Sequence, residues 1–122
     1  MRGTYLHNRV LVSQISQLLR SCGVTVHAEH HLGAGLGFAD LFAQRDGVRV
    51  LIEIERSPAR VGNDIAKAVA ARVPFLLIVT PDARLARACT RRIGRLGPTP
   101  SSLTVHVFPF GTALLRLQEV FP

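Results

Sequence analysis

Lysine is almost missing from this chain of 122 residues, which has one lysine, no tryptophan and two cysteines. Two cysteines are too few for a disulfide framework, and Cys22 and Cys89 each fall on the apolar side of a predicted helix, where buried free thiols are usual. Long hydrophobic runs are missing too, since the longest, Val73 to Val79, is far shorter than the roughly 20 residues of a membrane span. The N-terminus also lacks the hydrophobic region of a signal peptide. We therefore expect a cytoplasmic protein with no membrane partner.

Positive charge is in excess. Fourteen arginines and one lysine face eight acidic residues, which gives a formal net charge of +7. Such an excess on a small protein favours anionic partners, of which nucleic acid is the commonest. With 48% apolar residues and no internal repeat, the chain is expected to form a single domain over residues 1–122. The only lysine, Lys67, is a candidate for a chemical role that arginine could not fill.

Hydrophobic periodicity predicts eight elements in the order α-β-β-β-α-β-α-β, with a tail over 112–120 that fits either a strand or a short helix. Apolar residues at helical spacing from Leu6 to Leu19 predict the first helix, and the apolar run from Phe75 to Val79 is typical of a central strand covered on both faces. A helix connects the third predicted strand to the fourth, so these strands should be parallel. The expected fold class is α/β, with a mixed central β-sheet flanked by helices.

The clearest local signal is the pair Asp46-Gly47, which separates two strand-like segments within residues 38–55. An Asp-Gly pair in this setting predicts a β-hairpin with a two-residue loop. Arg45 then faces Val48, and this pairing sets the register of the whole hairpin.

The predicted register brings three acidic residues together. Asp40 lies opposite Glu53, and Glu55 lies diagonal to Asp40 on the same face. Like charges at cross-strand separations of about 4.5–5.5 Å are destabilising unless a cation or a bound proton intervenes, and a divalent metal is the natural partner. The opposite face is apolar, so a slip by one residue would put acids into the core. Its residues are Ala39, Leu41, Ala43, Val48, Val50, Ile52 and Ile54.

A second helix is expected to follow the hairpin. Ser57 and Pro58 suit its N-cap and first turn. Lys67 comes one helical turn after Asn63, so these two side chains are expected to share a face that looks toward the hairpin.

Together these residues resemble the PD-(D/E)xK nuclease superfamily, whose restriction endonuclease-like core is a helix, a three-strand meander, a helix and a fourth strand. The similarity covers roughly residues 6 to 80. Because the motif is short, it indicates the superfamily only together with the order of helices and strands. Asp40 matches the aspartate of the second core strand, and Glu53 matches the acid of the acid-x-lysine motif. Glu55 stands where the lysine usually sits. Some members carry glutamate there, and others supply the lysine from the following helix, which would be Lys67 here.

The resemblance implies a metal-dependent DNA endonuclease that hydrolyses phosphodiester bonds, similar to the junction resolvases of the superfamily. Asp40 and Glu53 would hold Mg²⁺ or Mn²⁺, with Glu29 of the first strand as an additional ligand. Glu55 would orient or deprotonate water, and Lys67 would stabilise the charge that develops on the phosphate. A homodimer is expected, because cutting both strands of a duplex or a junction needs two sites.

A basic stripe on the third predicted helix is the candidate DNA-binding surface, together with Arg56 after the hairpin. The stripe consists of Arg84, Arg87, Arg91 and Arg95. A solvated helix face is the commoner explanation of such a stripe. Two alternatives to a nuclease also stay open: a non-catalytic DNA-binding or assembly module on the same fold, and a small acid-lined metal-binding regulator.

Overall fold

The computed structural model describes residues 2–33, 35 and 37–121, which form an α/β fold. Its helices are α1 (Arg2–Ser21), α2 (Val61–Ala70), α3 (Ala83–Leu96) and α4 (Phe110–Val120), and a 3-10 turn, Pro58–Arg60, precedes α2. Its strands are β1 (Thr25–His31), β2 (Phe38–Arg45), β3 (Val48–Ile54), β4 (Phe75–Thr80) and β5 (Thr104–Pro109). The predicted order of elements is confirmed, and the tail that fitted either a strand or a helix is the helix α4.

The strands form one sheet in the order β1-β2-β3-β4-β5. β1, β2 and β3 are antiparallel neighbours, whereas β3 with β4 and β4 with β5 are parallel pairs connected through α2 and α3. The predicted parallel pair and the mixed sheet are therefore confirmed. β1 and β5 are the two edges of the sheet.

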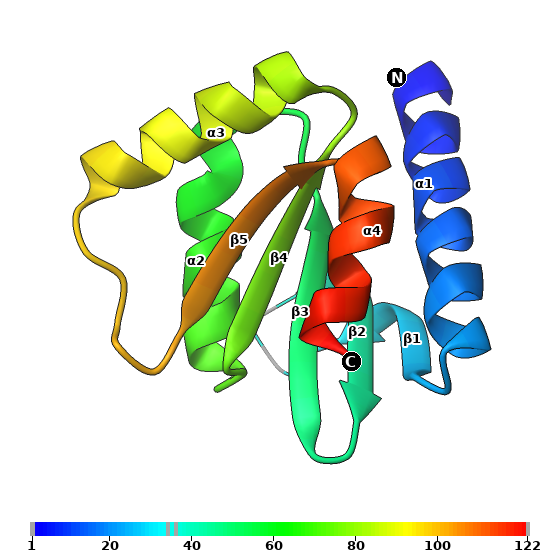
Figure 1. The fold of residues 1–122 in the computed structure, drawn as a ribbon. Helices are drawn as coiled ribbons and strands as arrows, with labels where there is room; N and C mark the ends of the chain where they lie inside the picture. The colour runs from blue at the N-terminus through cyan, green and yellow to red at the C-terminus, as the bar shows by residue number, and fades with distance from the viewer. Residues whose placement is uncertain (1, 34, 36, 122) are drawn as a thin grey trace.

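Helices cover both faces of the sheet, so the molecule has three layers (Figure 1). On one face α1 and α4 enclose a first apolar core, and on the other face α2 and α3 enclose a second. β4 contributes to both cores, because its alternate side chains point to opposite faces. Leu77 and Val79 belong to the first core, and Leu76 and Ile78 belong to the second.

The hairpin has the predicted loop and register. Asp46 and Gly47 have φ values of 51° and 80°, which is the left-handed conformation that a two-residue type I′ loop requires at both positions. Arg45 pairs with Val48, and the ladder continues in this register as far as Leu41 with Ile52.

One residue of the predicted apolar face lies elsewhere. Leu41 and Ala43 pack in the first core, as expected, but Ala39 packs in the second core. The alternation of β2 is therefore broken between Ala39 and Leu41, at Asp40. The physical reason is that regular backbone pairing with β3 ends at Leu41, and the side chain of Asp40 accepts the next amide of β3, that of Ile54.

The start of the second helix also differs from the prediction. Ser57 has an extended backbone and its side chain makes no capping hydrogen bond, so the chain first forms the 3-10 turn and then enters α2 at Val61. The third helix has a conventional cap, because the amide of Leu85 donates to Asp82 Oδ1 at 2.8 Å.

Both cysteines are free thiols, as predicted. Cys89 is buried in the second core, and Cys22, directly after α1, is half-buried. Among the described residues no helix combines the length and the apolar character needed to cross a membrane.

Candidate active site

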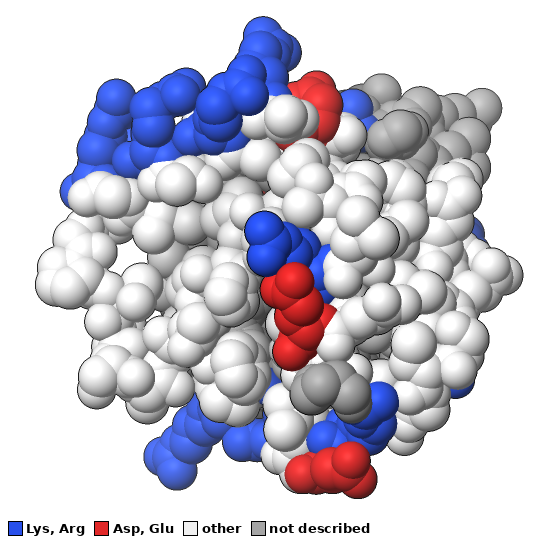
Figure 2. Space-filling model, in the orientation of Figure 1, with Lys and Arg blue, Asp and Glu red and all other residues white. Residues whose placement is uncertain are grey.

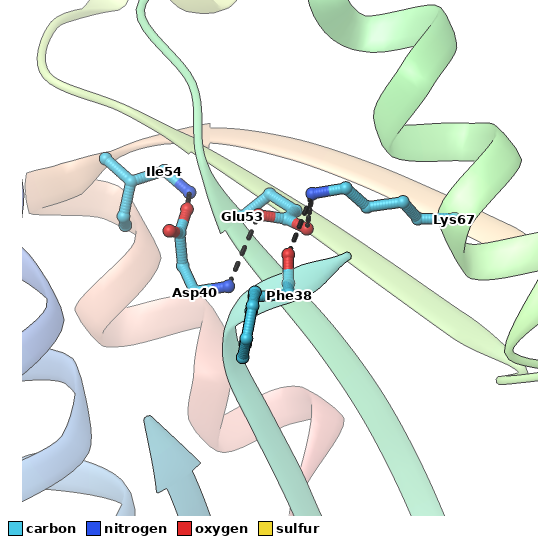
Figure 3. Close-up of polar contacts among 5 residues, drawn as sticks. All are labelled: Phe38, Asp40, Glu53, Ile54 and Lys67. Atoms are coloured by element: carbon cyan, nitrogen blue, oxygen red, sulfur yellow. Dashed lines mark hydrogen bonds and ion pairs between the residues drawn. The ribbon is translucent and has the colours of Figure 1, made fainter. Parts of the chain in front are cut away.

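Asp40 lies where the ladder between β2 and β3 ends. The last regular pair is Leu41 with Ile52, and the next position would pair Asp40 with Glu53. Side chains replace the backbone ladder there: the amide of Ile54 donates to Asp40 Oδ2 at 2.7 Å, and the amide of Asp40 donates to Glu53 Oε2 at 3.4 Å (Figure 3). The two carboxylates are thus cross-strand neighbours, as the register predicted. We call Asp40 and Glu53 the acid pair.

Lys67 reaches the acid pair from α2. Its Nζ donates to Glu53 Oε1 at 3.0 Å and to the carbonyl oxygen of Phe38 at 2.9 Å, so one ammonium group connects α2 to both β2 and β3 (Figure 3). The Glu53 side chain is only 5% exposed, and that of Lys67 is 25% exposed. Lys67 therefore faces the hairpin, as predicted. Asn63, expected on the same face, is exposed to solvent.

Burial and neighbouring charges shift the pKa of Glu53. Burial, and then the negative charge of Asp40, raise the pKa of Glu53 from 4.5 to about 7. The hydrogen bond and the charge of Lys67 lower this pKa, but they do not restore its ordinary value. At neutral pH the acid pair can therefore accept more positive charge, as a proton or as a cation.

Glu55 is held by the backbone that follows β3. Its Oε1 accepts hydrogen bonds from the amides of Arg56 and Ser57 at 3.1 and 3.0 Å, and the residue is 7% exposed. The turn after β3 therefore holds the Glu55 carboxylate, and the expected patch of three acids does not form a metal-holding group among the described residues.

Asp64 of α2 is an acidic residue that sequence reasoning missed. It is 4% exposed, and its Oδ2 has no hydrogen-bond partner. Burial, then a hydrogen bond with the Glu55 carboxyl group, then the charges of Glu55 and Glu53 raise the pKa of Asp64 from 3.8 to about 9. Burial and the neighbouring Glu55 carboxyl group therefore favour the protonated form of Asp64. A signal for its burial was available, since position 64 falls within the apolar stripe of its helix.

Glu29, the predicted additional ligand, lies level with Asp40 between the paired residues Ala28 and His30 of β1. Its φ of 50° is uncommon for a residue other than glycine and marks a local distortion of the strand. Glu29 and Asp40 both line a cavity of about 460 Å³ between α1 and the first two strands. Polar side chains of α1 form its other wall, among them Ser13, Ser16 and Gln17. Glu53 instead faces α2, on the other side of the sheet.

The arginine stripe lies on the outer face of α3 and does not meet the acid pair. Arg84, Arg87, Arg91 and Arg95 are all exposed, and Figure 2 shows a row of basic side chains along this helix. The opposite face of α3, which carries Cys89, packs in the second core. Arg56, the remaining predicted DNA contact, is exposed directly after β3.

A preformed metal cage is not present in the part of the chain that the structure describes. No three His, Cys, Asp or Glu side chains gather there in a way that could hold a metal ion. Mg²⁺, however, commonly takes only one or two protein carboxylates and fills its other positions with water and substrate phosphate.

Comparison with protein-family models, with curated proteins and with solved structures finds no match for this chain.

Replacing Asp64 by asparagine should remove a pH-dependent cost of folding. A carboxyl group whose pKa rises from 3.8 to about 9 on folding holds its proton more tightly in the folded state, so its contribution to the free energy of unfolding falls as the pH rises between these values. Asp64→Asn has no such proton to lose. The free energy of unfolding of the variant minus that of wild type should therefore increase from about pH 5 to about pH 8, measured by urea unfolding with chelator present.

Asp46→Asn is the control for this experiment, because Asp46 has a side chain that is 91% exposed at the tip of the hairpin. Its difference from wild type should change little over the same range. A difference for Asp64→Asn that is equally flat would mean that Asp64 is ionised in the folded protein.

Proposed function

We propose that this chain is a metal-dependent DNA endonuclease with a restriction endonuclease-like fold. The observation that carries the proposal is the contact of Lys67 Nζ with Glu53 Oε1 at 3.0 Å, beside Asp40 on the neighbouring strand. Hydrolysis of a phosphodiester needs an activated water and positive charge on the phosphate. Two adjacent carboxylates and one lysine are the side chains that can organise both.

The acid pair fits a Mg²⁺ or Mn²⁺ ion by its chemistry. One of its carboxylates is buried, and the repulsion from Asp40 contributes to the raised pKa of Glu53. A divalent cation would offset the negative charge that Lys67 compensates only in part. Asp40 and Glu53 would hold the ion, and water and substrate phosphate would fill its other positions; Glu29, on the cavity side, does not complete this set of ligands. When bound, the ion would polarise the phosphate and lower the pKa of a coordinated water.

The chain's own residues have distinct parts in this proposal. The amide of Ile54 fixes the orientation of Asp40 through the 2.7 Å hydrogen bond. The Lys67 side chain is 25% exposed, and its ammonium group would turn from Glu53 to a phosphate oxygen as negative charge develops. Glu55 and Asp64 form a buried carboxyl pair behind the site, so we assign them to positioning the turn after β3 rather than to water activation.

The direct test is incubation of the protein with labelled duplex, single-stranded, flapped and four-way-junction DNA. Each substrate is tested with Mg²⁺, with Mn²⁺ and with chelator, and cleavage is expected only with metal. Salt-dependent DNA binding without cleavage would instead favour the non-catalytic DNA-binding module. Metal binding without DNA binding would favour the metal-binding regulator. Sedimentation of the protein with and without DNA tests the proposed homodimer.

The metal should bind at the acid pair. Because a ligand that binds only the folded state raises its stability, Mg²⁺ or Mn²⁺ should raise the melting temperature of wild type more than that of Asp40→Asn. Asparagine keeps an oxygen that can accept the Ile54 amide, so the variant should fold. Asp46→Asn, in the same hairpin but 91% exposed, should respond as wild type does. Equal metal-induced shifts in all three proteins would place the ion elsewhere.

Lys67→Met should slow single-turnover cleavage by about 100-fold or more, because an uncharged side chain cannot stabilise the transition state. It should also move the pH dependence of cleavage to higher pH, since Lys67 is the group that lowers the pKa of Glu53. Lys67→Arg keeps the charge and should retain part of the activity, limited by the shape of the guanidinium. Cleavage by Lys67→Met at the wild-type rate and with the wild-type pH profile would exclude the lysine from the reaction.

The arginine stripe is proposed to contact phosphates away from the cleaved bond. Replacing Arg87 and Arg91 by glutamine should weaken DNA binding for all sequences and reduce the slope of log affinity against log salt by about two units at most. The charge-matched control is the double replacement of Arg72 and Arg116 by glutamine, which lie on other surfaces. If both double variants change the slope equally, the stripe is ordinary solvated surface.

A further inference from the structure

The cavity between α1 and the first two strands adjoins the acid pair and has room for more than a metal ion. Its volume is about 460 Å³, within the range of about 300–1,000 Å³ that is usual for sites of small organic ligands. Asp40 lines this cavity, whereas Glu53 faces α2 on the other side of the sheet. A group that entered the cavity would therefore lie next to a phosphate bound at the acid pair.

One face of α1 supplies a polar wall to the cavity. The residues of this wall recur at helical spacing, so they share one side of the helix. They are Arg9, Ser13, Ser16, Gln17 and Arg20. The neighbouring side of α1, with Leu11, Ile15 and Leu19, packs in the first core. The helix thus presents an apolar side to the core and hydrogen-bonding side chains to the cavity.

Ser16 indicates that this polar wall is more than solvated surface. The residue is 5% exposed and lines the cavity, yet its side chain makes no hydrogen bond among the described residues. Buried hydroxyl groups nearly always have a hydrogen-bond partner. A ligand in the cavity would provide one.

The charges of the cavity favour an uncharged ligand. Two arginines of α1, Arg9 and Arg20, are balanced by the carboxylates of Glu29 and Asp40 on the strands. One of the arginines is also engaged elsewhere, because Arg20 donates to the carbonyl oxygen of Val26 at 3.1 Å. A phosphate inside the cavity would be repelled by the two carboxylates. A neutral group with several donors and acceptors would not be.

A nucleobase has these properties. Its edge carries donors and acceptors, and side-chain amides and hydroxyls such as those of Gln17, Ser13 and Ser16 are groups that bind base edges. Its flat faces are apolar, and Val12 and Ala28 add apolar side chains to the lining. In a nucleic acid substrate, the group next to the phosphate at the acid pair is the sugar and base of the adjoining nucleotide.

We propose that the cavity beneath α1 receives one nucleobase, that of a nucleotide next to the cleaved phosphate. The inference rests on the proposed function in taking DNA as the substrate, and it names the substrate class as DNA with a displaced base at the point of cleavage. A base can enter such a cavity only after it has left the stack of the duplex. The cost of leaving is least for a base that is unpaired.

Binding measured in chelator separates base capture from cleavage. The probes are three fluorescently labelled duplexes of one sequence: one with a single bulged adenosine, one with an abasic site as the bulge, and one without a bulge. Wild type should bind the adenosine bulge about fivefold or more tightly than the abasic bulge, since these two probes differ only in the base. The continuous duplex should bind no better than the abasic bulge.

Ala28→Phe should fill the cavity from β1 and abolish the preference for the base. The Kd for the adenosine bulge should rise to that for the abasic bulge, which should stay as in wild type. Thr25→Phe is the matched control, because Thr25 is exposed on the same strand and does not line the cavity. It should keep the wild-type preference.

Gln17→Ala tests the polar wall without adding volume. It should raise the Kd for the adenosine bulge alone, by about two- to tenfold, as expected for the loss of a hydrogen bond. Gln14→Ala is its control, because Gln14 is exposed on the same helix outside the cavity. If Ala28→Phe lowers the melting temperature, Gln17→Ala decides in its place.

Two results would overturn the proposal. One is equal affinity of wild type for the adenosine and abasic bulges. The other is a wild-type preference for the base in a folded Ala28→Phe, or in Gln17→Ala where that variant decides.

The outcomes distinguish this inference from the proposed function. Base-dependent binding without metal-dependent cleavage would remove the nuclease and keep the base site. Metal-dependent cleavage with equal affinity for the two bulged duplexes would remove the base site and keep the nuclease.

Discussion

The ion pair between Lys67 and Glu53 is the contact on which the arrangement of the site depends. It joins α2 to the ends of β2 and β3, since the same ammonium group also binds the carbonyl oxygen of Phe38. Burial of a charged pair usually costs more in desolvation than the attraction returns, so such a pair is a weak device for stability. An apolar residue would pack under α2 at lower cost. The presence of the chain's only lysine at this position is therefore easier to explain by chemistry than by folding.

The hairpin and its register could be predicted because they rest on short-range rules. The Asp46-Gly47 loop fixes the pairing, and period-two alternation then sets which side chains face the core. The parallel pair of β3 and β4 follows from a helix between them. These rules place Asp40 and Glu53 side by side without knowledge of the rest of the molecule, and the structure agrees as far as Leu41 with Ile52.

The rest of the site could not be predicted because side chains there compete with the backbone ladder. Asp40 takes the amide of Ile54, so regular alternation fails at this position and Ala39 turns to the second core. Glu55 in turn takes the two amides that follow β3. Which amide each carboxylate accepts depends on the backbone donors that are left unpaired at a strand end. The alternation of apolar and polar residues does not identify those donors.

The distribution of charge also limits how a substrate can approach. The acid pair is closed on one side by α2, where Lys67 binds Glu53, and the arginines of α3 point outward from the second core. Asp40 is half-buried and borders the cavity beneath α1, and Phe38, two residues before it on β2, is exposed. The open side of the acid pair is therefore the cavity beside β1, and not the side covered by α2. If the proposed function is correct, the edge strand β1 is therefore a better place to look for substrate contacts than the basic helix α3.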